Sequence, residues 1–270
     1  MKKVSVLGPK GTFSDLACQK YMTKNENEII YLPSIEASVE ALSYADYAIV
    51  PIENTLDGYV QQTLDLLLEK EVYVIDEIYV PVQFSLIANV TKLEEIKKVY
   101  VQFVAKGQCH KFLKHLNTDK LIITESNMES FSLVQKNEIG DAAIIPFHMV
   151  NHFNGFKIDN VTDSSENYTR FFILSKSLQQ IKTDETKVSI VVNPIVDRPG
   201  LLFDILGIFK KYEVNLISIM SRPTKTEMGN YLFYIEMKSK TLDQNKIDQA
   251  LNEIQKEFKI KVLGIYPARG

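Results

Sequence analysis

The chain has 270 residues, of which 45% are hydrophobic and 24% charged, a balance typical of globular proteins and unlike that of disordered ones. Lys and Arg number 31 and Asp and Glu 34, for a net charge of -3, which argues against non-specific nucleic-acid binding because that requires clustered positive charge. No apolar run approaches the roughly 20 residues that span a bilayer, so no membrane partner is expected.

Targeting and metal signals are also missing. The apolar stretch that opens the chain at Val4–Leu7 is too short for the core of a signal peptide and is predicted to be a first strand. Cys18 and Cys109 are too few for a disulfide framework. The four histidines occur without an HExxH pattern, so no metal site is expected. These features predict a cytoplasmic protein.

The first part of the chain alternates strand and helix signals, which predicts a largely parallel sheet with helices on both faces. The expected strands are residues 4–7, 29–32 and 47–51, and the expected helices are residues 13–21, 35–42 and 58–69. A long β-rich run over residues 72–88, interrupted at Pro81, then breaks the alternation. Such a run is what a crossover between two lobes would look like.

A second series of strands and helices follows. Its expected strands are residues 99–101, 121–124 and 142–145, its helices lie near 105–115 and 128–135, residues 151–165 are irregular, and a further strand covers 170–174. We therefore expect two α/β lobes, the first built from about 1–78 plus 165–178 and the second from about 79–164, with chain crossings near 79–81 and between 156 and 169. Because ligands bind at the carboxyl ends of strands in open α/β sheets, the cleft between the lobes is the expected site.

The C-terminal part has another pattern, after a polar linker over residues 175–186. Strands are expected at 187–193, 214–221, 230–237 and 259–266, and amphipathic helices at 199–212 and 242–258. The order βαββαβ over residues 187–270 predicts a ferredoxin-like domain. With both helices on one face of its sheet, the other face or an edge would be free to pair with a partner.

Three polar stretches are candidates for chemistry, and each has a plain structural alternative. Gly8–Ser14 follows a strand and opens a helix, so its N–H groups suit either an anion cradle or a simple capped turn. Asn54 ends a strand and can both donate and accept hydrogen bonds, although Thr55 or Asp57 there would also cap a helix. Arg170 is either a carboxylate clamp or a solvated strand end.

Together these stretches resemble the prephenate dehydratase family over nearly the whole chain. The matching blocks are Gly8–Ser14, Pro51–Asn54 with Gly58, Gln108–Cys109 and Thr169–Phe171. Residues 197–202 and 221–223 resemble the two effector-binding turns of the ACT domain that is usually appended to these enzymes. The chain departs from the family pattern at Val101, where relatives carry serine, and at Met220, where relatives carry glutamate.

The resemblance implies a catalytic domain over 1–178 with two lobes like those of periplasmic binding proteins, and an ACT regulatory domain over 187–270. It implies decarboxylative dehydration of prephenate to phenylpyruvate, water and carbon dioxide, without a cofactor or metal. Arg170 would anchor the dianionic substrate, and Thr169 would donate a hydrogen bond to the departing hydroxyl. A homodimer or homotetramer is expected, with L-phenylalanine bound between subunits.

The residues that the resemblance assigns fall into three groups. The catalytic ones are Thr169, Arg170, Asn54 and Gln108; the substrate-binding ones are Gly11, Thr12, Phe13, Ser14, Glu53, Thr55 and Phe171; and the effector-binding ones are Gly200, Leu201, Leu202, Asn215, Leu216, Ile217, Ser221 and Arg222. Two alternatives stay open. One is the same chemistry on arogenate, whose ammonium would need a carboxylate such as Glu53 or Asp57, and the other is an amino-acid sensor without catalysis.

Overall fold

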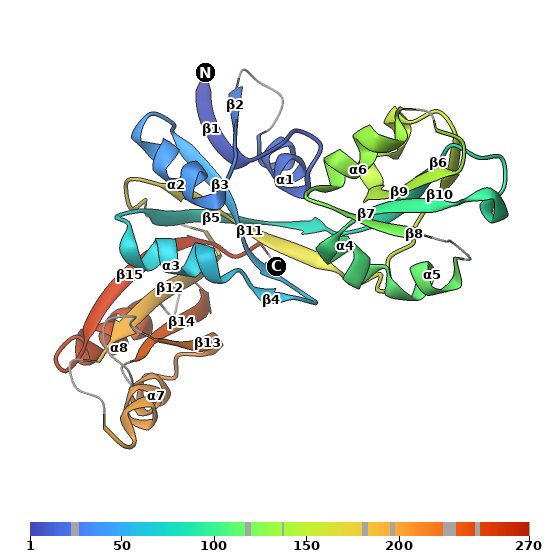
Figure 1. The fold of residues 1–270 in the computed structure, drawn as a ribbon. Coiled ribbons are helices and arrows are strands. Elements are labelled where there is room, and N and C mark those ends of the chain that lie inside the picture. Colours follow the sequence, from blue (N-terminus) through green and yellow to red (C-terminus); the bar gives the residue numbers. More distant parts are fainter. Residues whose placement is uncertain are drawn as a thin grey trace.

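The computed structural model describes the chain except for residues 23–26, 117–119, 137, 180–182, 195–197, 224–230, 241–243 and 270. Two α/β lobes lie side by side, and the C-terminal domain packs beneath the first lobe (Figure 1). The predicted mixed α/β architecture with a βαββαβ C-terminal domain is confirmed. Within the described residues, no helix is long and apolar enough to cross a membrane.

The first lobe is built on β1 (Lys2–Leu7), which lies between β2 (Asn27–Leu32) and β3 (Tyr47–Asn54) in parallel. The sheet continues from β3 through β11 (Tyr168–Ser175), which returns from the second lobe and pairs antiparallel with β3 and with β5 (Tyr73–Pro81). Helix α1 (Phe13–Tyr21) covers one face of this sheet, and α2 (Ile35–Glu40) and α3 (Gln61–Glu69) cover the other.

The first-lobe sheet has a hydrophobic core on each face. Successive side chains of β11 point alternately to one core and the other, as strand geometry requires. Phe171 packs with Val4 and Val6 on the α1 side, whereas Phe172 packs with Leu64 and Leu67 on the α3 side. Both phenylalanines are almost fully buried. The face to which each β11 side chain points therefore decides its role.

The second lobe is a separate five-stranded sheet with the strand order β10-β6-β9-β7-β8. Its strands are β6 (Phe84–Ala88), β7 (Lys98–Gln102), β8 (Lys120–Thr124), β9 (Asp141–Pro146) and β10 (Phe156–Ile158), and its helices are α4 (Phe103–Gln108), α5 (His110–His115) and α6 (Asn127–Val134). The helix expected near 105–115 is thus two helices, because the backbone leaves the helical region at Cys109, with φ -118° and ψ 25°.

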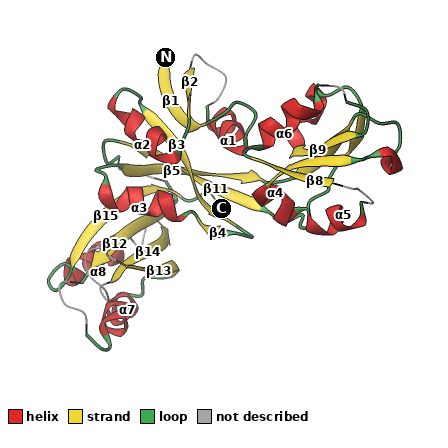
Figure 2. Cartoon of the chain, in the orientation of Figure 1, coloured by secondary structure: helices red, strands yellow, loops and turns green. Residues whose placement is uncertain are grey.

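The C-terminal domain runs β12 (Glu185–Asn193), α7 (Leu201–Lys211), β13 (Leu216–Pro223), β14 (Tyr231–Lys240), α8 (Gln244–Ile254) and β15 (Lys259–Pro267). Asp197, Asn230 and the expected helix start at 242–243 lie outside the described residues. Both helices pack on one face of the sheet (Figure 2).

The other face of this sheet is not free, contrary to the sequence-based expectation. Its Val191, Tyr234, Leu263 and Tyr266 pack against α3 and the first-lobe sheet in one shared core. β15 also pairs with β5 at the single register pair Gly264–Val74. This pairing joins the C-terminal sheet and the first-lobe sheet into one continuous sheet, with β13 at one edge. The open edge of the domain is therefore β13.

Two further differences concern turns. The expected helix over 58–69 begins only at Gln61, because Gly58–Tyr59 forms a short strand, β4, that folds back on β3. Residues 41–43, 93–95 and 147–152 form 3₁₀ helices.

Candidate active site

The polar residues at the end of β3 meet those of the second lobe in a closed hydrogen-bonded circuit. Asn54 Nδ2 donates to Asn167 Oδ1 at 2.9 Å, and Asn167 Nδ2 donates to Gln108 Oε1 at 2.9 Å. Gln108 Nε2 then donates to Asp57 Oδ2 at 2.7 Å, and the Asp57 backbone N–H donates to Asn54 Oδ1 at 3.1 Å. Asn54, Gln108 and Asn167 are buried. The circuit joins the first-lobe hairpin, helix α4 and the returning chain before β11.

The orientation of each side-chain amide follows from the two ends of the circuit, one a carboxylate and the other a backbone N–H. A carboxylate only accepts, so Gln108 presents its NH₂ to Asp57 and its oxygen to Asn167. A backbone N–H only donates, so Asn54 presents its oxygen to Leu56 and Asp57, at 2.9 and 3.1 Å. The Asn54 NH₂ group must therefore point toward β11.

That NH₂ group holds the hydroxyl of Thr169. Asn54 Nδ2 donates to Thr169 Oγ1 at 2.9 Å. Among the described residues the Thr169 hydroxyl has no acceptor of its own, so its proton remains available to a ligand. The side chain is half-buried. Thr169, Asn54 and Gln108, which the sequence predicts as site residues, are thus brought together.

Arg170 lies on the opposite face of β11 from Thr169, where it lines a cavity of about 420 Å³ with Asn54 and Thr55. Its role as the substrate anchor stays a prediction. Its side chain is 4% exposed. The guanidinium contacts Glu236 of β14 at 2.8 Å, Glu53 at 3.2 Å and Glu77 at 3.4 Å. Glu53 accordingly pairs with Arg170 and not with a group in the circuit. The reason is strand alternation, which sends neighbouring side chains to opposite faces.

The Gly8–Ser14 turn is a capped helix start. Thr12 Oγ1 accepts from the Asp15 backbone N–H at 3.3 Å, and the Gly11 N–H donates to Asp15 Oδ2 at 2.8 Å. Because the buried Asp15 carboxylate already occupies the Gly11 amide, the turn offers that donor to no other anion. Ser14 is buried as well.

The same turn nevertheless touches the second lobe. His148 Nε2 donates to the Gly11 carbonyl at 3.0 Å, and burial lowers the pKa of His148. The ring of Phe13 packs edge-on to Phe84 at 5.4 Å and to His148 at 5.7 Å. Gly11 and Phe13 therefore form the lobe junction on the α1 side.

Two more predicted substrate-binding residues have structural partners. Phe171 is 1% exposed and belongs to the α1-side core, so the prediction that it touches a substrate is wrong for this structure. Thr55 Oγ1 donates to the Tyr168 carbonyl at 3.1 Å and accepts from its N–H at 3.1 Å. Thr55 therefore fastens the β3–β4 hairpin to the start of β11.

Comparison with known proteins assigns this architecture. A family model described as prephenate dehydratase matches residues 4–179, and one described as ACT domain matches residues 195–259. The chain belongs to the prephenate dehydratase family. The family predicted from the sequence motifs is thus confirmed.

Individual relatives are similar over their whole length. A prephenate dehydratase of Methanocaldococcus jannaschii is 31% identical over 266 residues, which are 96% of this chain and 96% of the relative. The crystal structure of the prephenate dehydratase from Staphylococcus aureus has a TM-score of 0.85 at 30% identity, covering 99% of this chain and 100% of that one. The enzyme from Arthrobacter aurescens in complex with L-Phe has a TM-score of 0.86 at 27% identity, covering 98% and 90%.

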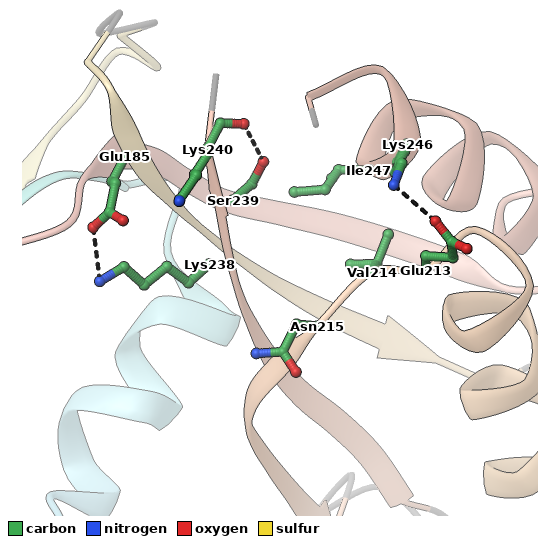
Figure 3. Close-up of a pocket in the computed structure, with 9 residues that line it drawn as sticks. All are labelled: Glu185, Glu213, Val214, Asn215, Lys238, Ser239, Lys240, Lys246 and Ile247. Carbon is green, nitrogen blue, oxygen red and sulfur yellow. Dashed lines mark hydrogen bonds and ion pairs between the residues drawn. The ribbon is translucent and has the colours of Figure 1, made fainter. Parts of the chain in front are cut away.

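The residues predicted to bind an effector in the ACT domain fall around two cavities. Gly200, Leu201, Leu202 and Ser221 line a cavity of about 310 Å³ together with Tyr231 and Phe233 of β14. Asn215 instead lines a second cavity of about 410 Å³, among Glu185, Glu213, Lys238 and Lys246 (Figure 3). Figure 3 shows ion pairs joining Glu185 to Lys238 and Glu213 to Lys246 there.

The remaining predicted effector residues point elsewhere. Arg222 contacts Gln61 and Asp65 of α3, so its guanidinium faces the catalytic region and not the 310 Å³ cavity. Leu216 packs against the ACT core, and Ile217 is 41% exposed on the open-edge strand. One chain thus holds two separate parts of the predicted effector site.

Sequence reasoning missed Asn167 and the role of Asp57 in the circuit. Asn167 is fully buried and bonds both Asn54 and Gln108. Its signal is its place two residues before Thr169, just ahead of β11, because side chains two residues apart in an extended chain point to the same side. The sequence indicates Asp57 as a helix cap or as a carboxylate for an ammonium, but not as a partner of Gln108, which is 51 residues away in sequence.

Proposed function

We propose that the chain catalyses the decarboxylative dehydration of prephenate to phenylpyruvate, water and carbon dioxide. The observation that carries this proposal is the Thr169 hydroxyl, which is held by Asn54 at 2.9 Å beside the junction of two lobes. Family membership supplies the substrate class. Asn54, Gln108 and Thr169 then form the reactive end of the site.

The reaction requires few catalytic groups. The bond between the ring carbon and the carboxylate breaks, its electrons pass through the ring, and the hydroxyl on the far ring carbon leaves as water once it has gained a proton. The new aromatic ring supplies the driving force, so no electron sink is needed beyond the substrate. What the protein adds is orientation and a hydrogen-bond donor at the departing oxygen.

Thr169 has the geometry for that donor role. Because its oxygen accepts a hydrogen bond from Asn54, its own proton is polarised and directed away from Asn54. A threonine hydroxyl is a very weak acid, so Thr169 stabilises the departing oxygen by hydrogen bonding, and the proton that completes the water comes from another donor or from solvent. Gln108 and Asn167 keep Asn54 in this orientation.

The test is turnover of prephenate by the purified chain. Phenylpyruvate, detected by its absorbance in alkali, should form well above the acid-catalysed background measured without protein. A parallel assay with arogenate decides between the two related substrates. If neither substrate turns over while an amino acid binds between the lobes in a titration, the chain is a sensor and the proposal fails.

We further propose that L-phenylalanine inhibits the enzyme at a subunit interface of the ACT domain. Tyr231, Phe233 and Leu202 around the 310 Å³ cavity suit an aromatic ring. The apolar side chains of Phe203, Leu206 and Ile219 are exposed beside the open edge strand β13, and a second copy would cover them and that edge. This arrangement supports a homodimer or a pair of dimers.

Two measurements test the effector. L-phenylalanine should lower prephenate turnover, with a coupling of about 1–3 kcal/mol or roughly 5–150-fold in affinity. Sedimentation should show a dimer or larger species. A turnover rate that does not respond to L-phenylalanine, or a monomer at every concentration, contradicts this part of the proposal.

A further inference from the structure

Arg170 connects the strand that carries Thr169 to the ACT domain. Its guanidinium donates to both oxygens of Glu236, from Nη1 at 3.1 Å and from Nη2 at 2.8 Å. Glu236 lies in the middle of β14 and is 1% exposed. A bidentate pair of this kind fixes orientation as well as distance.

The surroundings of the pair keep it ionised and rigid. Glu236 Oε1 also accepts from Ser189 at 3.1 Å and from Tyr266 at 2.9 Å. Burial raises the pKa of Glu236, but the charge of Arg170 and the hydrogen bonds from Arg170 and Tyr266 together bring the net pKa below the usual value. Lys187 of β12 bonds Glu77, the other buried carboxylate that Arg170 contacts, at 2.8 Å. Ion pairs thus join β5 and β11 to two ACT strands.

A second contact joins the ACT domain to the other half of the site. Tyr59 in β4 shares a hydrogen bond of 2.6 Å with Ser218 of β13. The hairpin between β3 and β4 carries Asn54 and Asp57. The two elements that present Thr169 and Asn54 are therefore each attached to the ACT sheet.

The attached strands also reach the proposed effector cavity. Tyr231 and Phe233 of β14 line the 310 Å³ cavity, and Glu236 lies three residues beyond Phe233 on the same strand. Ser221 of β13 lines the same cavity, three residues beyond Ser218. A ligand that moves these strands acts on Glu236 and Ser218 directly.

We propose that Arg170 is a positioning residue, which transmits the position of β14 through Glu236 to Thr169, and that it does not bind substrate. The inference rests on the proposed prephenate dehydratase activity and names the route by which the ACT domain acts on it. Because Arg170 and Thr169 are adjacent in β11, a displacement of Glu236 shifts the backbone that aims the Thr169 hydroxyl at its target.

The kinetic test compares Arg170→Gln, Glu236→Gln and the double variant. Both single variants should lower kcat for prephenate by a similar factor of roughly 2 to 30 while KM changes little, and the double variant should be no worse than either. Glu253→Gln on α8, which removes an exposed ion pair with Lys211, is the matched control and should behave as the parent. A raised KM in Arg170→Gln with a normal Glu236→Gln would overturn the proposal, because that pattern marks a substrate ligand.

If Arg170→Gln does not fold, Arg170→Lys is the alternative variant, because it keeps the positive charge next to the buried carboxylates. It should still lower kcat, since an ammonium cannot reproduce the two-point contact. If Arg170→Lys keeps the parental kcat, the bidentate contact has no positioning role.

A second readout does not depend on activity. Backbone amides of residues 168–171 should exchange hydrogen for deuterium several-fold faster in Glu236→Gln than in Glu253→Gln. If the parent turns over prephenate but exchange is equal in both variants, the inference fails and the proposed function stands. If no variant or parent turns over prephenate, the proposed function fails, and the exchange difference still reports the coupling.

Discussion

The Thr169 hydroxyl accepts one hydrogen bond, from Asn54, and its own proton can be donated to a ligand. Asn54 therefore fixes the direction in which Thr169 donates. An amide that donated elsewhere would leave the hydroxyl free to rotate. Asn54 is prevented from turning because its oxygen is held by two backbone N–H groups. The catalytic donor is therefore aimed by a neighbour that is itself fixed.

We expect Thr169→Ala to lower kcat by roughly two to three powers of ten, as removal of one transition-state hydrogen-bond donor does elsewhere. KM should change little, because the hydroxyl acts mainly on the departing oxygen. Steady-state kinetics with prephenate measures both values. Thr169→Ser keeps the hydroxyl and should retain most of the rate, and a fully active alanine variant would refute the donor role.

Asn167 does not bond Thr169, but it holds the side-chain amides of Asn54 and Gln108 in the circuit. Asn167→Ala should lower the free energy of unfolding by about 1–3 kcal/mol, because it removes one hydrogen bond of Asn54 and leaves the buried Gln108 Oε1 without its donor. It should also lower kcat. Urea unfolding measures the first effect. The exposed Asn154→Ala is the control and should change stability by less than about 0.5 kcal/mol.

At the scale of elements, β11 shows what the sequence could and could not predict. The Thr-Arg-Phe pattern predicts Thr169 as a site residue, and the structure places its hydroxyl beside Asn54. The pattern does not reveal that Phe171 is a core residue, because a family motif carries no information about which face each residue occupies. Strand alternation sends the side chains of Thr169 and Arg170 to opposite faces of β11, although Arg170 still lines a cavity with Asn54. The carboxylates that receive Arg170 come from distant segments, and no local pattern predicts them.

The contact between β15 and β5 is a second element-scale feature, and it depends on a missing side chain. A Cβ at Gly264 would overlap the Val74 carbonyl oxygen and come within 2.8 Å of the Val74 Cβ. The two sheets can approach here only because residue 264 is glycine. Backbone atoms cannot move aside as a flexible side chain does.

Gly264→Ala should therefore lower the free energy of unfolding by about 1–3 kcal/mol through overpacking. The variant should also weaken inhibition by L-phenylalanine, because the added methyl group pushes β15 of the ACT domain away from β5 of the first lobe. Gly207→Ala in α7 is the matched control, because a Cβ there meets nothing within 4 Å. That control should be stabilised by about 0.4–1 kcal/mol. Equal stability of the two variants in chemical unfolding would show that the sheets are not in close contact.

For the whole molecule, the buried ion pairs make the joint between catalytic region and ACT domain sensitive to acid. The pKa of Glu236 lies below its usual value of 4.5 in the folded chain, because burial, which raises it, is outweighed by the charge of Arg170 together with the hydrogen bonds from Arg170 and Tyr266. Ionised Glu236 then stabilises the fold above its unfolded pKa, and this contribution is lost as pH falls through the lower, folded pKa.

We therefore expect Glu236→Gln to be less stable than the parent at pH 7, with the difference shrinking as pH falls below about 4.5. Unfolding in urea at a series of pH values measures this. The exposed Glu36→Gln serves as control and should track the parent across the series. A difference that is constant with pH would mean that Glu236 carries no net charge in the fold.

The overall architecture was more predictable than the joint between its parts. Alternating strand and helix signals predicted two lobes and a βαββαβ domain, because each element follows from local periodicity. The packing of the ACT sheet on α3 was not predicted, because Val191, Tyr234 and Leu64 read only as ordinary core residues in sequence. The amphipathic pattern shows that a face is buried, but not which surface buries it.

The proposed roles of Thr169 and Arg170 require their side chains to face opposite sides of β11. A crystal structure with phenylpyruvate bound tests this directly. We predict the product between the lobes, within hydrogen-bond distance of Thr169 Oγ1 or Asn54, while Arg170 keeps its bidentate contact with Glu236. A product carboxylate bound by the Arg170 guanidinium, with Glu236 displaced and Thr169 out of reach, would contradict the account.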